Sequence, residues 1–279
     1  MPLPATIVGR STEPVIHEID AEWLAAFAAS IDDRAETAVA HPLFPVCVEW
    51  AAVTAAARLD DGALLPDERR RGIHATHDLT IHRLLRAGDV LTTIATVEAL
   101  AAHRRGTFEQ LRLETRDAVG ALVATTVMGS LFLGVAIEGA PRPSEAGATA
   151  ASDRPALAKT APVSTTEIAV AADQAMRYSE ASRIWNPIHT DTAAATAAGL
   201  PAPVLHGTCT LAMATSAALA SAGIADPNAV RRVQARFAGM VLMPSTLELR
   251  VMQPSAREVC FDVVDREGVA VIRGGHLTT

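Results

Sequence analysis

The chain has 279 residues, of which 49% are hydrophobic, so it is long enough for one large domain or two ordinary ones with a packed core. This composition excludes a disordered or fibrous protein. The formal net charge is −7 and the arginines are scattered without a basic run, which argues against a nucleic-acid partner.

Three cysteines, Cys47, Cys209 and Cys260, form no C-x-x-C pair and are odd in number. They favour a reducing compartment over a disulfide framework or a zinc site. The first residues lack a charged segment followed by a long apolar one, so we expect no signal peptide and a cytoplasmic protein.

Two uncharged stretches are long enough to be mistaken for membrane spans. Residues 118–137 contain three glycines and many Val and Thr residues, which favours a buried strand pair. Residues 207–225 contain several Thr and Ser residues and are typical of a helix buried in protein. Neither stretch predicts a membrane partner.

The first half of the chain predicts two helices followed by strands. Residues 20–30 have an amphipathic pattern with Asp20 as candidate N-cap, and residues 45–58 form a helix that is apolar on nearly every face. A turn then leads into an alternating strand at 86–97, and an Asp-x-x-Gly turn joins two strands at 111–123.

Residues 138–164 are rich in turn-forming residues without apolar periodicity, which predicts a linker. Beyond it the same order of elements recurs in a weakly similar sequence, which indicates a duplicated module. The repeated elements are an amphipathic helix at 172–182 with Asp173 as candidate N-cap, an apolar helix at 206–223, a turn and strand at 242–251, and an Asp-x-x-Gly hairpin at 259–271.

A helix that is apolar on every face must be surrounded by protein, and a curved antiparallel sheet later in each half is available to wrap it. That arrangement is a hotdog. We therefore predict an α+β fold of the double-hotdog type, with modules at residues 1–137 and 165–279 joined by the linker 138–164. The two sheets should lie edge to edge.

The most informative motif runs from Tyr178 to His189 and contains Asn186-Pro-Ile-His189. Proline fixes its own φ and biases the preceding residue away from helix, so His189 should project from a loop. Seventeen residues later, His206-Gly207 opens the second apolar helix. An imidazole with a pKa of about 6.5 beside helix N-terminal amides suits proton transfer next to an acyl carbonyl.

This motif resembles that of the MaoC-like (R)-specific enoyl-CoA hydratases and acyl dehydratases, which have the hotdog fold. Their usual pattern is Ser-Gly-Asp-x-Asn-Pro-x-His, and the position of the catalytic aspartate holds Ile184 here. The resemblance implies a hydro-lyase that needs no cofactor or metal and that reversibly adds water to a 2-enoyl thioester of CoA or acyl-carrier protein. His189 would be the general acid/base, Asn186 would orient the loop or the water, and Gly207 would polarise the thioester carbonyl.

The resemblance also implies a substrate-binding role for further motif residues, namely Tyr178, Ile184, Trp185, His206 and Thr208. The first half would be degenerate and would accommodate the acyl chain. Assembly as a homodimer is left open.

Isoleucine cannot accept a proton, so the reaction would have to proceed without the motif aspartate, and there are three alternatives. Glu180 lies four residues before Ile184, on the same helical face, and could replace it. Asp191 could also do so, although it has the pattern of an N-cap for a following helix. The third alternative is that His189 works alone.

The first half offers little competing chemistry. Asp32 aligns with Ile184, but Asp32 and Asp33 are expected to be solvated charges at a helix end. His74, His77 and His82 lie on a predicted strand and could line a tunnel. The odd spacing from His74 to His77 should place their side chains on opposite faces, which argues against a shared metal site.

Two other functions fit part of the pattern. Hotdog proteins also hydrolyse thioesters, usually with a carboxylate on the buried helix. The predicted buried helix of the second half, within residues 206–225, has no carboxylate, and Glu49 is the one such acid on the predicted helix of the first half. Loss of the aspartate would also suit a non-catalytic acyl-thioester-binding protein. CoA phosphates would have to meet scattered arginines, with Arg183 and Arg236 as candidates.

Overall fold

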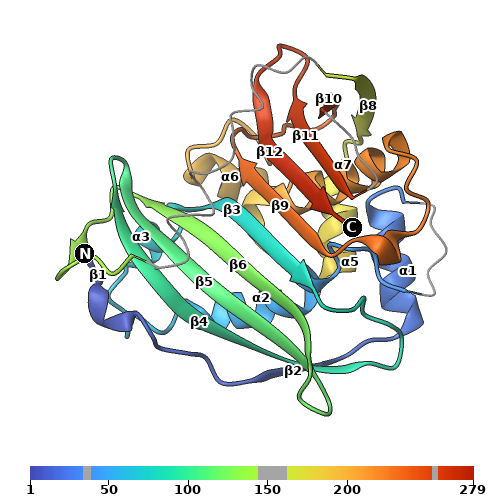
Figure 1. The fold of residues 1–279 in the computed structure, drawn as a ribbon. Coiled ribbons are helices and arrows are strands. Elements are labelled where there is room, and N and C mark those ends of the chain that lie inside the picture. Colours follow the sequence, from blue (N-terminus) through green and yellow to red (C-terminus); the bar gives the residue numbers. More distant parts are fainter. Residues whose placement is uncertain (34–38, 144–161, 253–256) are drawn as a thin grey trace.

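The structure is a computed structural model and describes residues 1–33, 39–143, 162–252 and 257–279. In these ranges the strands form one large antiparallel sheet with the order β2-β4-β5-β6-β3-β9-β12-β11-β10-β8 (Figure 1). The strands are β2 (Val15–Glu18), β3 (Gly72–Ile81), β4 (Val90–His103), β5 (Gly106–Asp117), β6 (Leu122–Leu133), β8 (Ser164–Val170), β9 (Arg232–Phe237), β10 (Ser245–Met252), β11 (Glu258–Val264) and β12 (Ala270–Thr278). A short parallel pair joins β1 (Leu3–Pro4) to β7 (Ile137–Glu138).

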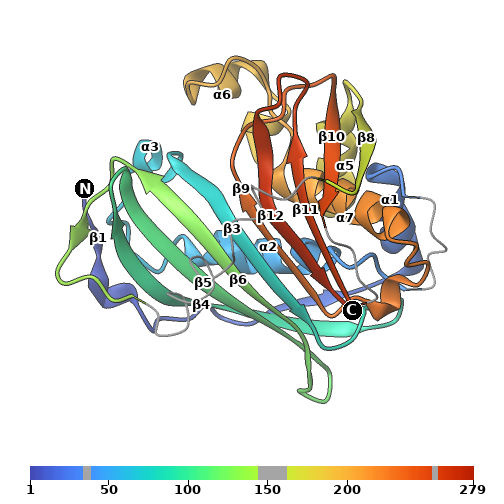
Figure 2. The ribbon, with the colours of Figure 1, turned by 45° about the horizontal axis from the view of Figure 1, so that its top comes forward.

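Two buried helices lie against the inner face of this sheet. Helix α2 (Pro45–Ala56) packs on β4 and β5 of the first half, and α7 (Gly207–Ser221) packs on β8, β10 and β11 of the second (Figure 2). Each half is thus a curved sheet around one helix, and the predicted double hotdog is confirmed. The remaining helices are η1 (Ala5–Ile7), α1 (Ala21–Ser30), α3 (Pro66–Arg69), α5 (Gln174–Ser182), η3 (Pro187–His189), α6 (Thr192–Ala197) and η4 (Pro227–Ala229).

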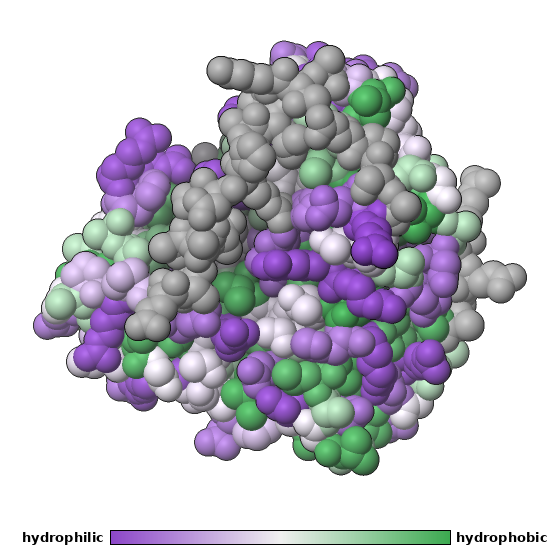
Figure 3. Space-filling model, in the orientation of Figure 1, coloured by the Kyte–Doolittle hydropathy of each residue, from purple (hydrophilic) through white to green (hydrophobic). Residues whose placement is uncertain are grey.

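Strands β3 and β9 join the halves edge to edge, with His77 opposite Ala235. On the outer face of this junction Asp78 accepts hydrogen bonds from Arg232 at 2.7 Å and from Gln234 at 2.6 Å. Figure 3 shows hydrophilic groups among apolar ones across this face. The module boundaries stay a prediction, and residues 144–161 of the proposed linker lie outside the described residues.

Residues 118–137 contain one long strand, β6, which lies between a turn at Gly120 and the two-residue β7, so the predicted strand pair is wrong. Gly129 is paired within the β5–β6 ladder, and its neighbours occupy the space that a side chain would need. A Cβ at this position would collide with Thr76 and the ring of Phe108. Within the described ranges, no helix has both the length and the apolar character needed to cross a membrane.

The N-caps agree with the sequence in two of three cases. The carboxylate of Asp20 accepts from the N–H of Trp23 at 2.6 Å, and that of Asp191 accepts from Ala194 at 2.7 Å. Asp173 stands at the N-cap position of α5 without a capping hydrogen bond and pairs with Arg177 instead.

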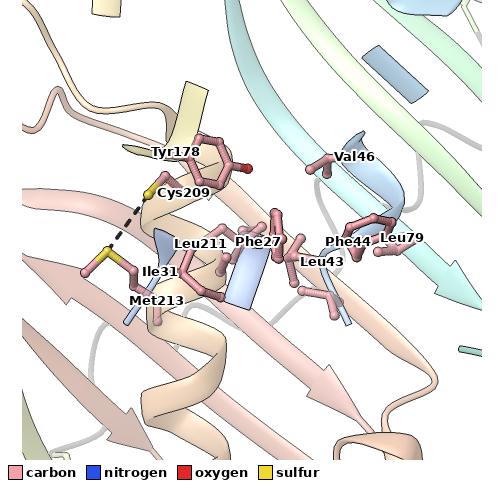
Figure 4. Packing of buried hydrophobic residues seen from close by; sticks show 14 of the residues in the cluster. Phe27, Ile31, Leu43, Phe44, Val46, Leu79, Tyr178, Cys209, Leu211 and Met213 are labelled. Atoms are coloured by element: carbon pink, nitrogen blue, oxygen red, sulfur yellow. Dashed lines mark hydrogen bonds between the residues drawn. The ribbon is translucent and has the colours of Figure 1, made fainter. Parts of the chain in front are cut away.

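Helix α1 of the first half packs against α5 of the second and supports the segment that precedes the motif loop. Gln174 donates to the carbonyl of Ser30 at 2.6 Å, and the indole of Trp23 donates to the carbonyl of Ala181 at 2.8 Å. The rings of Phe27 and Tyr178 lie 5.8 Å apart in the shared core (Figure 4). One hydrophobic cluster therefore spans the two halves and fixes the start of the motif, and a second cluster lies within the first half.

Two of the cysteines, Cys47 and Cys209, are free thiols on the buried helices α2 and α7. Cys47 and Cys209 are buried and Cys260 is half-buried. Burial raises the pKa of the Cys209 thiol, and its sulfur lies 4.0 Å from that of Met213 on α7. Cys47 and Cys209 act as small apolar groups of the core.

Candidate active site

The motif loop begins with a sharp turn at the end of α5. Ser182 donates its hydroxyl to the carbonyl of Tyr178 at 2.6 Å, and Arg183 takes a left-handed conformation with φ of 60°. The Arg183 guanidinium lies over the ring of Trp23, 3.7 Å from its centroid. This cation–π contact ties the turn to the first half of the chain.

Asn186 shapes the next turn as the sequence predicts for a residue before proline. Its side-chain oxygen accepts from the N–H of Ile188 at 3.4 Å, and its carbonyl accepts from the N–H of His189 at 3.1 Å. Pro187 takes the first position of the short helix η3, where the missing N–H costs nothing. Asn186 therefore orients the backbone that carries His189.

The imidazole of His189 is half-buried, and its Nδ1 lies 2.7 Å from the carbonyl oxygen of Val204. A carbonyl only accepts, so Nδ1 carries the proton and Nε2 keeps its lone pair. Within the described residues Nε2 has no hydrogen-bond partner. Burial lowers the pKa of His189, and the Val204 carbonyl partly opposes this. The ring is thus a neutral base with its acceptor nitrogen available.

His206 lies directly against the ring of His189. The two rings are stacked with centroids 3.7 Å apart, and Nε2 of His206 lies 3.2 Å from the Ser179 hydroxyl. Burial, then the neighbouring His189, lowers the pKa of His206 well below its usual value. Beside it the Tyr178 hydroxyl donates to Thr208 at 3.0 Å. The structure therefore brings four predicted site residues, Tyr178, His189, His206 and Thr208, into one cluster.

Helix α7 begins at Gly207, directly after His206, and no side chain caps it. Its first N–H groups have no acceptor within the helix, and the helix dipole makes this end attractive to negative charge. A Cβ on Gly207 would lie 3.0 Å from two ring carbons of Phe237. The glycine thus lets the Phe237 ring pack against the helix start.

Ile184 is buried at 5% exposure, and its carbonyl approaches the His206 ring closely enough to raise that pKa in part. Glu180 is exposed on α5, and Asp191 caps α6. In the described ranges the carboxylates that contact histidines are those near His41 and His276, not these two. Trp185 is 56% exposed beside the loop.

The histidines of β3 lie differently from the prediction. A bulge between His74 and Thr76 cancels the odd spacing, so the His74 and His77 side chains share a face and their rings make an edge contact with centroids 5.5 Å apart. The expected placement on opposite faces is wrong for this reason. The His74 ring also meets Phe237 at 4.7 Å, which connects β3 to the start of α7. His82 is exposed and contacts Thr125.

The expectation that Asp33 is a solvated charge is wrong, whereas Asp32 pairs with Arg177 near the surface. Ser216 of α7 donates to Asp33 at 3.1 Å and lies 3.1 Å from Nε2 of His41. The N–H of Leu43 donates to Nδ1 of His41, so Nε2 carries the proton and donates to Ser216. This direction cannot activate a serine nucleophile, and the three groups instead link α7 to the first half.

Glu49 is buried on α2 and accepts a hydrogen bond from Thr126 of β6 at 2.7 Å. Burial raises its pKa to about 7, with Thr126 opposing. In the described residues no three or more His, Cys, Asp or Glu side chains gather as a metal site would require.

The fold and the loop together define a double-hotdog protein with two stacked histidines beside the start of a buried helix. The family model described as MaoC like domain matches residues 153–272. 3-Hydroxyacyl-thioester dehydratase X of Mycobacterium tuberculosis is 30% identical over 240 residues, which cover 84% of this chain and 77% of that protein. The chain belongs to the MaoC-like dehydratase family.

Other relatives match over shorter segments. Enoyl-CoA hydratase ChsH3 of Mycobacterium tuberculosis is 38% identical over 90 residues, 32% of each chain. Peroxisomal multifunctional enzyme type 2 of Drosophila melanogaster is 34% identical over 116 residues, 42% of this chain but 19% of that protein. The chain thus spans well under half the length of these two curated relatives.

Solved structures agree on the fold. A MaoC-like dehydratase from Phytophthora capsici superposes with a TM-score of 0.82 at 22% identity, covering 98% of this chain and 97% of the other. A Mycobacterium tuberculosis protein described as a double hotdog superposes with a TM-score of 0.64 at 15% identity, covering 97% and 95%.

Proposed function

We propose that this protein is a hydro-lyase that reversibly hydrates a 2-enoyl thioester of CoA or acyl-carrier protein, with His189 as general acid/base. The observation that carries the proposal is the hydrogen bond from Nδ1 of His189 to Val204 at 2.7 Å, which leaves Nε2 unprotonated. The names of the relatives, which include enoyl-CoA hydratase and 3-hydroxyacyl-thioester dehydratase, support the same reaction class.

In this mechanism water attacks C3 of the enoyl group while Nε2 of His189 takes its proton. The electron pair of the double bond moves toward the thioester carbonyl, and the resulting enolate oxygen accepts hydrogen bonds from N–H groups at the start of α7, near Gly207 and Thr208. The imidazolium then gives its proton to C2, so water is added across the bond and His189 is restored. The reverse sequence eliminates water.

Ile184 leaves His189 without the aspartate of the usual motif. Glu180 is exposed and Asp191 is engaged as an N-cap, so we assign both proton transfers to His189 alone. Asn186 holds the loop, and Tyr178, Trp185 and His206 surround the thioester in this proposal. The protein should therefore have a lower kcat for hydration than relatives that keep both the aspartate and the histidine of the motif.

The test is a hydration assay of the purified protein with crotonyl-CoA and longer enoyl-CoA thioesters, in which the loss of enoyl absorbance is measured. His189→Ala should lower kcat/KM by about 10²–10⁴-fold. His82→Ala removes an exposed histidine and serves as the matched control, which should retain full activity. Release of free CoA would instead indicate a thioesterase, and binding without turnover an acyl-thioester-binding protein.

A further inference from the structure

His77 is a buried imidazole without a visible purpose in the fold. It is 2% exposed, and in the described part of the chain neither Nδ1 nor Nε2 has a hydrogen-bond partner. A buried polar group that stays unpaired is destabilising, so native proteins rarely keep one without a water or ligand. The ring therefore needs a polar partner that comes from outside the chain.

His77 belongs to a strip of polar side chains on the inner face of the sheet. Cross-strand pairs share a face, and β6 places Ser130 opposite His74 and Thr126 opposite the residue two positions after His77. Thr126 in turn holds the buried carboxyl of Glu49 at 2.7 Å. An interior built only for a hydrocarbon chain would have no use for these groups.

The strip adjoins the proposed reaction centre. His77 contacts the His74 ring at 5.5 Å, His74 contacts Phe237 at 4.7 Å, and the Phe237 ring packs against Gly207. His77 lies on β3 at the junction of the halves, opposite the small side chain of Ala235. The strip therefore lies next to the start of α7, where the proposed mechanism places the thioester.

The chemistry of the ring points to one kind of partner. Burial lowers the pKa of His77 to about 4, so the imidazole is neutral at physiological pH. A neutral imidazole offers one donor and one acceptor on different edges of the ring, and a hydroxyl group is a small substituent that can pair with either of them.

We propose that His77 is a specificity-determining residue that hydrogen-bonds a hydroxyl group on the acyl chain of the substrate. The preferred substrates are then hydroxylated enoyl thioesters and not plain hydrocarbon ones. This inference rests on the proposed hydratase function. It assigns the inner face of the first half a recognition role in addition to the space it provides.

The experiment measures kcat/KM for pairs of enoyl-CoA thioesters of increasing chain length, each with and without a terminal hydroxyl. Wild type should prefer the hydroxylated member at one or more lengths by about tenfold, the value of one well-formed hydrogen bond in a buried site. His77→Phe should abolish the preference, and His77→Asn, which keeps a donor and an acceptor, should retain part of it.

His82→Phe is the matched control, because it makes the same change just beyond the end of β3 on an exposed side chain, and its preference should equal that of wild type. If His77→Phe does not fold, His77→Met takes its place. Equal kcat/KM for both members of every pair in wild type overturns the inference while leaving the hydratase intact. Hydration of neither member would instead refute the hydratase proposal itself.

Discussion

The imidazole rings of His189 and His206 are stacked 3.7 Å apart at an angle of 27°, and burial lowers the pKa of both. Protonation of both rings to imidazolium is unfavourable in such a stacked pair, because the two positive charges would repel each other at short range. His189, the less buried ring, takes the first proton. The pair is therefore neutral in the working range, as a general base requires.

We expect kcat/KM for hydration to be constant near neutral pH and to fall on the acid side. His189 must be unprotonated to accept a proton from water, and its pKa lies below the usual value of about 6.5. The acid limb should therefore lie below pH 6.5 and fall tenfold per pH unit. A pH–rate profile checks this, and a limb centred above pH 7 would contradict a neutral, buried base.

Ile184→Asp should restore a two-group site. The backbone of residue 184 lies beside the His206 ring, so a carboxylate on this residue would lie near the stacked imidazoles and raise their pKa. We expect a rise in kcat of about tenfold or more from a second proton-transfer group. We also expect a loss of about 1–3 kcal/mol of stability, because the position is buried.

Ile184→Asn is the matched control for this change, since asparagine has nearly the same shape as aspartate without the charge. It should lose stability and gain no rate. Equal rates for the two variants in hydration assays would show that the charge at residue 184 has no part in the reaction. Melting temperatures measured alongside separate rate effects from loss of folded protein.

Gly207→Ala should disturb the helix start through Phe237. The new Cβ would lie 3.0 Å from two ring carbons, so the ring or the helix must shift by a few tenths of an ångström. A shift at the N–H groups that would bind the enolate oxygen in the proposed mechanism should lower kcat/KM by about 10–100-fold. Stability should change little, because alanine favours the helix by up to about 1 kcal/mol.

A second substitution tests the cause. Phe237→Leu opens space at the contact, so the double variant should recover most of the activity that Gly207→Ala loses, and Phe237→Leu alone supplies the baseline. Full activity of Gly207→Ala in the same steady-state assay would show that the glycine serves neither packing nor catalysis.

The fold was accessible from the sequence because its signals are local. The duplicated module is indicated by two apolar helices, at 45–58 and 206–223, each of which is followed by an Asp-x-x-Gly hairpin. The motif likewise predicts that His189 leaves the helix, since Pro187 prevents its continuation. These features depend on residues close together in the chain.

Features that depend on distant segments were not accessible. The bulge near His74 carries no glycine or other marker, yet it turns two rings toward each other. Asp33 looks like an ordinary helix-end charge until α7 brings Ser216 against it. Likewise, the orphan nitrogens of His77 become visible only when its neighbours are in place. Periodicity reports which face a residue uses but not what it meets there.

The buried carboxyl of Glu49 predicts a pH-dependent stability. Its pKa rises from 4.5 to about 7 on folding, so the folded state holds the proton more tightly than the unfolded state between these values. Stability from this group is complete below pH 4.5 and is lost as the pH rises through 7. Ionised Glu49 at pH 8 then costs about 3 kcal/mol relative to its protonated form.

Glu49→Gln removes this titration while keeping an acceptor for Thr126. The variant should unfold at a higher denaturant concentration than wild type at pH 8, and the difference should shrink toward zero at pH 5, where wild-type Glu49 is protonated. Glu22→Gln changes an exposed glutamate on α1 and should show no such pH dependence. A Glu49→Gln effect of equal size at both pH values would mean that Glu49 is ionised throughout, held by a contact other than Thr126.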